Sequence, residues 1–175
     1  MTRDQDEVIS QLYQNVRRQD AQVISGRWRI STFLAHQAKF SQSVQQWLDA
    51  FQAGLVNQIL VPFLVAVYGD SARAHLTLRH KQSLGSIISK AYRWNQMVKT
   101  EVILLDFQPI MFPNGTRYDS TSMTLLDQKV VPVPAEPIIS TVSFGLQSSE
   151  AEGGGQPVKR VWQEKVMVLT EGYFE

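Results

Sequence analysis

The spacing of apolar residues changes near Thr100, and this change constrains the fold more than any other feature. Before Thr100 apolar residues recur every three or four positions, as on one face of a helix. After it, short runs of β-branched and aromatic residues indicate strands. Proline and glycine concentrate in the second part, with one proline and four glycines before the change and six of each after it. We predict an α+β fold: a helical subdomain over 1–100, then a small antiparallel β subdomain over 101–175, packed as one unit.

Four helices are predicted in the first subdomain. They cover about 4–19, 27–52, 55–68 and 84–100. The third is apolar almost all round, so we expect it to lie innermost in the bundle. Gly54 and Gly69 follow the second and third helices, where a left-handed residue often ends a helix. Residues 72–81 are predicted to form a short helix or an ordered loop.

Strands and turns are predicted in the second subdomain. The strand-like runs are 102–107, 129–133, 138–144 and 158–169. Asn114-Gly115 is a strong turn signal. Residues 148–157 contain three consecutive glycines at 153–155 and predict a flexible, solvent-exposed loop.

The cellular location is inferred from what the chain contains. It has no cysteine, which excludes disulfides and cysteine metal sites. Its first residues are polar and acidic, unlike a signal peptide. The longest apolar stretch, Ile59 to Tyr68, has about half the length that a helix needs to span a bilayer. We interpret this stretch as core and expect a cytoplasmic protein with no membrane partner, and no glycan at the sequon that begins at Asn114.

No motif for catalysis is present. The histidines are too few for a zinc site in a chain without cysteine, and no His-Glu-x-x-His occurs, so we expect no metal and no cofactor. A Gly-x-Ser-x-Gly elbow is absent, and the glycines at 153–155 do not lead into Lys-Ser or Lys-Thr. We therefore assign no catalytic residue. An enzyme with an unrecognised site is the third alternative, and it would need His75 or His80 to meet Asp106 or Asp119.

The charge distribution is uneven. Residues 71–100 contain six lysines and arginines and no aspartate or glutamate. On the helix predicted over 84–100, Lys90 and Arg93 share a face opposite Ile87, Ile88 and Ala91, with Trp94 near its edge. A basic helix that carries an aromatic suits an acidic protein surface or phosphates. The predicted partner-binding residues are Arg73, Arg79, Lys81, Lys90, Arg93 and Trp94.

These observations favour a non-catalytic interaction or regulatory module that binds an acidic protein. Self-association is expected as well, because the apolar face of a helix over 27–52 is longer than a small monomer covers. A nucleic-acid-binding protein that uses the helix over 84–100 is the alternative; a net charge of +1 means that any such affinity must come from a local patch. The basic residues could also be neutralised within the chain by Glu150, Glu152, Glu164 and Glu171.

The order of motifs in the second part resembles a known family. Gly115-Thr-Arg-Tyr-Asp119 followed by Met123, and the later Gly145-Leu146, Arg160 and Val166-Met-Val168, are similar to the pattern of the GrpE family. That family consists of nucleotide exchange cofactors of DnaK-type chaperones, with a dimerising helix and helical bundle before a compact β domain. The resemblance implies a chaperone cofactor. Ser120 stands where the family usually has proline, and no functional residue is carried over.

Overall fold

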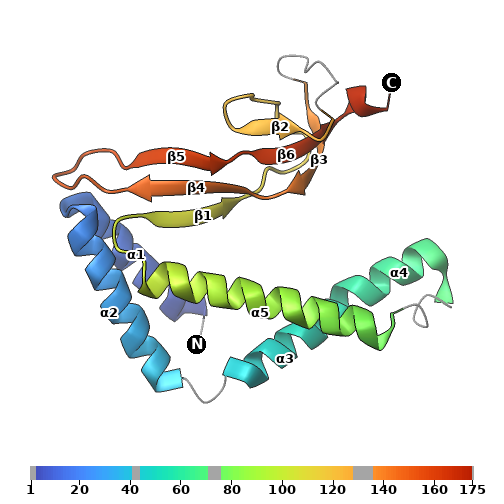
Figure 1. The fold of residues 1–175 in the computed structure, drawn as a ribbon, viewed down its shortest axis with the longest axis horizontal. Helices are drawn as coiled ribbons and strands as arrows, with labels where there is room; N and C mark the ends of the chain where they lie inside the picture. The colour runs from blue at the N-terminus through green and yellow to red at the C-terminus, as the bar shows by residue number, and fades with distance from the viewer. Residues whose placement is uncertain (1–2, 41–43, 71–75, 128–135, 175) are drawn as a thin grey trace. The chain divides into compact units, whose positions relative to one another are not determined.

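The computed structural model of the chain confirms the α+β class, with helices first and two small sheets after them (Figure 1). It describes residues 3–40, 44–70, 76–127 and 136–174. The chain divides into two compact units. The helical unit is Ile30–Glu101, and the β unit joins Met1–Arg29 to Val102–Glu175. The first helix therefore belongs with the strands, whereas the sequence pattern suggested a division at residue 100.

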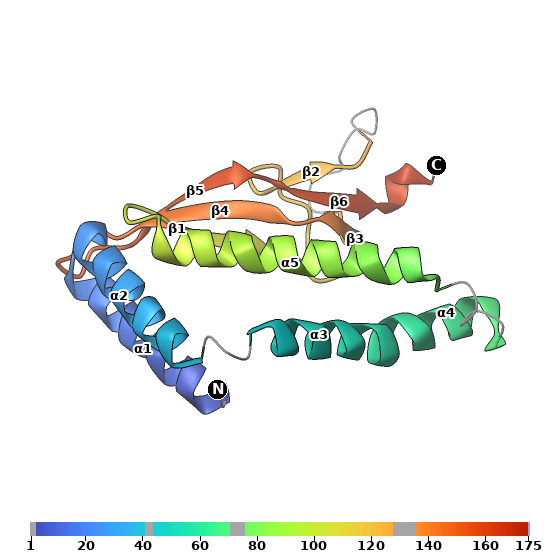
Figure 2. The ribbon, with the colours of Figure 1, turned by 60° about the horizontal axis from the view of Figure 1, so that its bottom comes forward.

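Two three-stranded sheets form the second part of the β unit (Figure 2). The first has the order β1-β4-β5 and is antiparallel; the second has the order β2-β6-β3. In the second sheet β3 runs antiparallel to β6, but β2 runs parallel to it, so this sheet is mixed. Some forty residues separate β2 from β6, enough for the crossover that a parallel pair requires. The strands are β1 Asp106–Ile110, β2 Met123–Leu125, β3 Ile138–Ser143, β4 Gly145–Glu150, β5 Lys159–Glu164 and β6 Val166–Thr170.

The predicted strands differ from these in instructive ways. The run 158–169 is two strands, because the chain leaves one sheet at Lys165 and enters the other. β4 was not predicted, since its sequence Gly-Leu-Gln-Ser-Ser-Glu has no β-branched residue. The predicted strand at 129–133 lies outside the described residues.

The core of the β unit lies on the mixed sheet. Its buried members are Met123, Leu125, Ile138, Val166 and Val168, with Ile110, Phe112, Tyr118 and Trp162 packed against them. Alternate residues of β6 point into this core, as the period of two in a strand requires. Gly145 permits the close approach of β4 to β6, since a Cβ atom there would lie 2.7 Å from Val166 Cγ2.

The loop between β4 and β5 packs against the end of helix α1 (Arg3–Gln19). Gly154 N donates to Gln19 O at 2.9 Å, and Gly155 N donates to Arg18 O at 2.8 Å, so the loop caps the helix. Gly153, which has a positive φ, is so close that a Cβ atom would lie 2.7 Å from Ala21 N. The prediction of a solvent-exposed loop over 148–157 is confirmed only in part: residues 154–157 are exposed, but 148–150 belong to β4 and Gly153 is buried against the end of α1.

Helix α2 (Gln22–Phe40) begins at the same corner of the β unit. Gln22 N donates to Ala151 O at 2.7 Å, and the Gln22 side chain accepts from Ala151 N at 2.9 Å. Both residues are buried. These two hydrogen bonds hold the start of α2 to the segment that follows β4.

The helical unit contains three further helical segments that run without interruption. They are α3 (Val44–Leu55), the π-helical turn η2 (Val56–Leu60) and α4 (Val61–Tyr68). The predicted helix over 27–52 corresponds to parts of α2 and α3; residues 41–43, between them, lie outside the described residues. Gly54 does not end a helix, because η2 continues it; η2 lies just before Pro62, whose missing N–H disturbs helical bonding. Gly69 does end α4, with a φ of 75°.

Helix α5 (Leu78–Thr100) lies beside α3 (Figures 1 and 2). It starts six residues earlier than predicted, because Thr77 and His80 form a reciprocal capping box at its N-terminus. Gln52 Nε2 donates to Lys81 O at 2.8 Å, and the ring centroids of Trp47 and Tyr92 are 6.4 Å apart. These contacts fix α3 antiparallel to α5.

Helix α4 is not covered by the rest of the described structure. The prediction that residues 55–68 lie innermost is wrong: no residue of α4 is buried. Among the described residues, one continuous helix, Val44–Tyr68, has the length and the apolar composition that a membrane-spanning helix needs. Only 6% of its most apolar 18-residue window is buried. An exposed apolar helix is the least expected feature of the fold.

Candidate functional site

The cationic face of α5, formed by Arg79, Lys90 and Arg93, is the first candidate. At 100° per residue the three side chains fall within about 60° of each other, along about 21 Å of helix. All three are exposed. Within the described part of the helical unit, none forms an ion pair with an aspartate or glutamate. This face therefore carries three charges available to a partner.

The other predicted partner-binding residues lie elsewhere. Lys81 is exposed but points about 200° from Arg79, on the side where its backbone carbonyl meets α3. Trp94 is half-buried, about 70° from the centre of the cationic face. Arg73 lies outside the described residues. The structure thus groups three of the six predicted residues on one face.

The apolar side of α5 differs from the sequence interpretation. Ile88 and Val98 are buried, as a core-facing stripe requires. Ile87, predicted to lie opposite the basic residues, is 63% exposed, and Ala91 is exposed as well.

A second candidate is the cluster around Asp106 in the β unit, which the sequence analysis did not identify. Arg17 Nε lies 3.0 Å from Asp106 Oδ2, and Arg29 Nη1 forms an ion pair with Asp106 Oδ1. The hydroxyl of Tyr13 donates to both carboxylate oxygens, at 2.7 and 2.8 Å. Arg17 also donates to Ser149 Oγ at 2.9 Å. The Asp106 cluster consists of these five residues.

Side chains from four elements meet in this cluster. Tyr13 and Arg17 come from α1, Arg29 from α2, Asp106 from β1 and Ser149 from β4. Tyr13 stacks on Trp28 with the ring planes 7° apart. Arg29 further donates to the backbone carbonyls of Leu105 and Val102. The cluster therefore joins both helices of the β unit to its first sheet.

Two guanidinium groups share one carboxylate here. Burial lowers the pKa of both Arg17 and Arg29, and it is the largest cause in each. The Arg17 charge lowers the pKa of Arg29 further. Arginine starts from so high a pKa that both groups stay charged at neutral pH. The Asp106 cluster thus holds an excess of one positive charge, and the carboxylate is its only acidic member.

The chemistry of the Asp106 cluster is structural. It contains no thiol, no histidine and no lysine, and its one carboxylate forms ion pairs with two guanidinium groups and accepts hydrogen bonds from Tyr13. A general base needs a free lone pair within reach of a substrate. We therefore interpret the cluster as a clamp that positions α1 and α2 on the sheet.

A signal for this clamp exists in the sequence. Asp106 stands in the apolar run Val102 to Phe107, and a carboxylate in a segment expected to be buried must have a partner. Its partners lie about 77 and 89 residues earlier in the chain, so helical or strand periodicity does not reveal them. Arg17 in particular reads as a surface residue in the last turn of an amphipathic helix.

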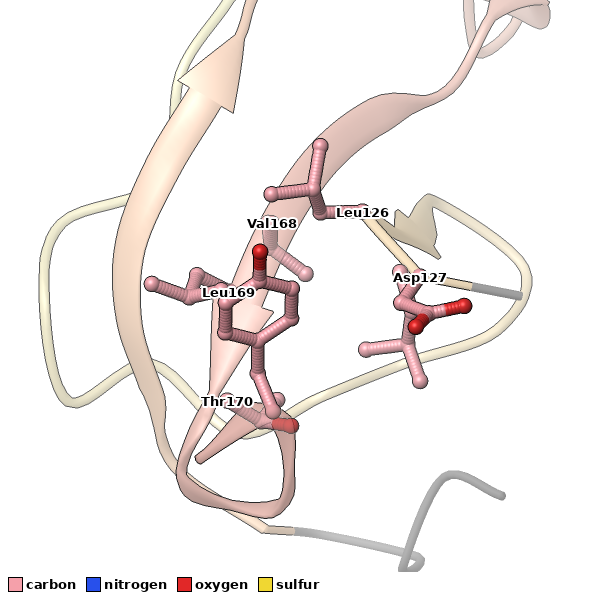
Figure 3. A pocket seen from close by; sticks show the side chains of 7 residues that line it. Leu126, Asp127, Val168, Leu169 and Thr170 are labelled. Atoms are coloured by element: carbon pink, nitrogen blue, oxygen red, sulfur yellow. The ribbon is translucent and has the colours of Figure 1, made fainter. Parts of the chain in front are cut away.

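The remaining features offer little room for a substrate or metal. The hollow lined by Leu126, Asp127, Val168, Leu169 and Thr170, together with Leu125 and Tyr173, has a volume of about 10 Å³ (Figure 3). That is about the space of one water molecule. Among the described residues, no group of three metal-ligating side chains is close enough to hold an ion. His80 belongs to the cap of α5, and His75 lies outside the described residues.

Comparison with protein-family models, with curated proteins and with solved structures finds no match for this chain.

Proposed function

We propose that the chain is a non-catalytic interaction module whose cationic face on α5 binds an acidic protein. The observation that carries the proposal is the set of three exposed cations without an acidic partner in the helical unit. A row of like charges on one helix face costs stability through repulsion, and a partner of opposite charge relieves it.

A protein partner suits this face better than nucleic acid. Three charges along about 21 Å release few counterions, whereas duplex DNA binding at physiological salt draws on many more phosphate contacts. The half-buried Trp94 near the edge adds apolar contact area of the kind found at protein interfaces. Nucleic-acid binding is the second reading, and the salt dependence of affinity separates the two.

The test uses fluorescent poly-glutamate as a stand-in for an acidic protein surface and mixed-sequence duplex DNA as the competitor class. We expect poly-glutamate to bind and the double variant Lys90→Glu with Arg93→Glu to weaken binding at least tenfold, as measured by fluorescence anisotropy. Circular dichroism checks that the fold is intact. Tighter binding to DNA, with affinity falling steeply with salt, would favour the second reading.

A matched control separates the cationic face from net charge. The variant Arg117→Glu with Lys159→Glu makes the same change of charge at two exposed positions of the β unit. We expect it to bind poly-glutamate within about twofold of the wild type. Equal weakening by both double variants would contradict a defined binding face.

Three expectations from the sequence stay predictions: self-association, a cytoplasmic location and the GrpE-like role as a chaperone cofactor. Self-association rests on the long apolar face predicted over 27–52. Light scattering on the purified chain tests it directly.

A further inference from the structure

A stripe of exposed apolar side chains runs along η2 and α4. Ile59, Phe63 and Val67 are 58, 61 and 55% exposed and follow each other at intervals of four, so they lie on one side of the helix. Tyr68, at the end of α4, is 64% exposed. We call these four residues the α4 stripe. Scattered exposed apolar residues are ordinary, but a continuous stripe marks a binding surface.

The α4 part of the stripe lies on a helix that is apolar on all its sides. Between Asp49 and Asp70 the sequence has no charged residue, and α4 itself has no polar side chain except the Tyr68 hydroxyl. A helix that is apolar all round is found in the core of a protein or in a membrane. Within the described structure α4 is not in a core, because none of its residues is buried.

Positive charge lies beside this helix. α5 begins at the end of the helical unit where α4 lies (Figures 1 and 2). Its first turn carries the exposed Arg79 and Lys81, and the bond from Gln52 to Lys81 O ties that turn to the helix leading into α4. Cations next to an inserted apolar segment attract anionic lipid headgroups.

A second copy of this chain fits the stripe less well. A twofold contact would pair the same patch from both copies and bring the α5 cations of each copy together. Lipid headgroups instead supply the opposite charge. Tyr68 also suits the boundary between headgroups and hydrocarbon, where tyrosine is enriched.

We propose that the α4 stripe inserts into one leaflet of an anionic lipid bilayer. The segment from Ile59 to Tyr68 is about 15 Å long, half of the hydrocarbon thickness, so it does not span the membrane. The preceding helix cannot extend the inserted part, since α3 is bound to the charged helix α5. This attachment is a separate proposal from the binding of an acidic protein, which is tested at Lys90 and Arg93; Arg79 takes part in both.

Vesicle flotation tests the insertion, with phosphatidylcholine vesicles that contain or lack phosphatidylserine. We expect the wild-type chain to float with the anionic vesicles and to bind the neutral ones more weakly. The triple variant Ile59→Ser, Phe63→Ser, Val67→Ser should lose at least tenfold in partition coefficient. The control Val8→Ser, Leu12→Ser, Ile87→Ser changes three side chains of similar exposure and should stay within about twofold.

A fluorescent label reports the depth. Because the chain has no cysteine, Val67→Cys provides one site for an environment-sensitive dye, and Ser83→Cys on α5 provides an exposed control. With anionic vesicles the emission at position 67 should shift to the blue, while that at 83 should not.

Four results would overturn the insertion. The first is a wild-type chain that does not float with either kind of vesicle. The second is a triple serine variant that binds as well as its control, and the third is no emission shift at position 67. The fourth is a wild-type dimer that the triple serine variant converts to monomers while neither binds vesicles, which would assign the stripe to a second copy.

Discussion

Removal of the Asp106 carboxylate should destabilise the β unit strongly. In Asp106→Asn, Arg17 and Arg29 stay in place with side chains that are only 9 and 11% exposed and lose the charge that offsets them. Breaking a buried pair by removing one partner costs about 3–5 kcal/mol. Here one carboxylate serves two guanidinium groups, so we expect the upper part of that range. This is a third or more of the total stability of a typical domain, about 5–15 kcal/mol.

Urea unfolding followed by circular dichroism measures this loss. Glu152→Gln, at an exposed position of the same unit, is the control and should change stability by no more than about 0.5 kcal/mol. The combination of Asp106→Asn with Arg29→Met should be less destabilising than the sum of the single changes, because it also removes one of the two stranded charges. A loss below about 1 kcal/mol for Asp106→Asn, or strict additivity in the combination, would refute the clamp.

Three further predictions concern single positions. In thermal unfolding, Gly153→Ala should destabilise the chain by about 1 kcal/mol more than Gly154→Ala. Both glycines have a positive φ, but only Gly153 lies against the backbone of Ala21. Equal effects of the two changes would contradict the packing of this loop against α1. Gly54→Ala should stabilise it by about 0.5–1 kcal/mol, since Gly54 lies within a helix with open space around it; a loss of stability would restore Gly54 as a helix end. Hydrogen bonds from Thr121, and next in size the one from Ser122, lower the pKa of Asp119. The Asp119 carboxylate therefore stabilises the fold above its unfolded pKa of about 4. This stabilisation is lost as the pH falls through the lower pKa of the folded state. Wild type should therefore have a higher melting temperature than Asp119→Asn at pH 7, and this gap should narrow as the pH falls below about 4. A gap that widens with acid would contradict this sign.

Features that depend on the local sequence pattern were predicted correctly. The α+β class and the end of α4 at Gly69 are confirmed, because periodicity and a left-handed glycine act within a few residues. Arg79, Lys90 and Arg93 of α5 also share one face, as helical geometry requires, whereas Lys81 lies on the opposite side.

Features that depend on distant contacts were missed. The glycines at 153–155 indicated a flexible loop, but their small size lets the loop approach the end of α1. The apolar character of α4 indicated a core helix, but apolarity alone does not tell protein interior from lipid. The partners of Asp106 are set by how helices and sheet assemble, and a single sequence does not record that.

Lysine labelling tests most directly whether the cationic face is exposed and binds an acidic partner. The chain is treated with an amine-reactive reagent with and without poly-glutamate, and the extent of labelling at each lysine is measured by mass spectrometry. Lys90 should react fast in the free chain and at least fivefold more slowly with poly-glutamate present, while Lys159 in the β unit should react at the same rate in both. A Lys90 that reacts slowly in the free chain, or at an unchanged rate when poly-glutamate is bound, would contradict a free binding face on α5.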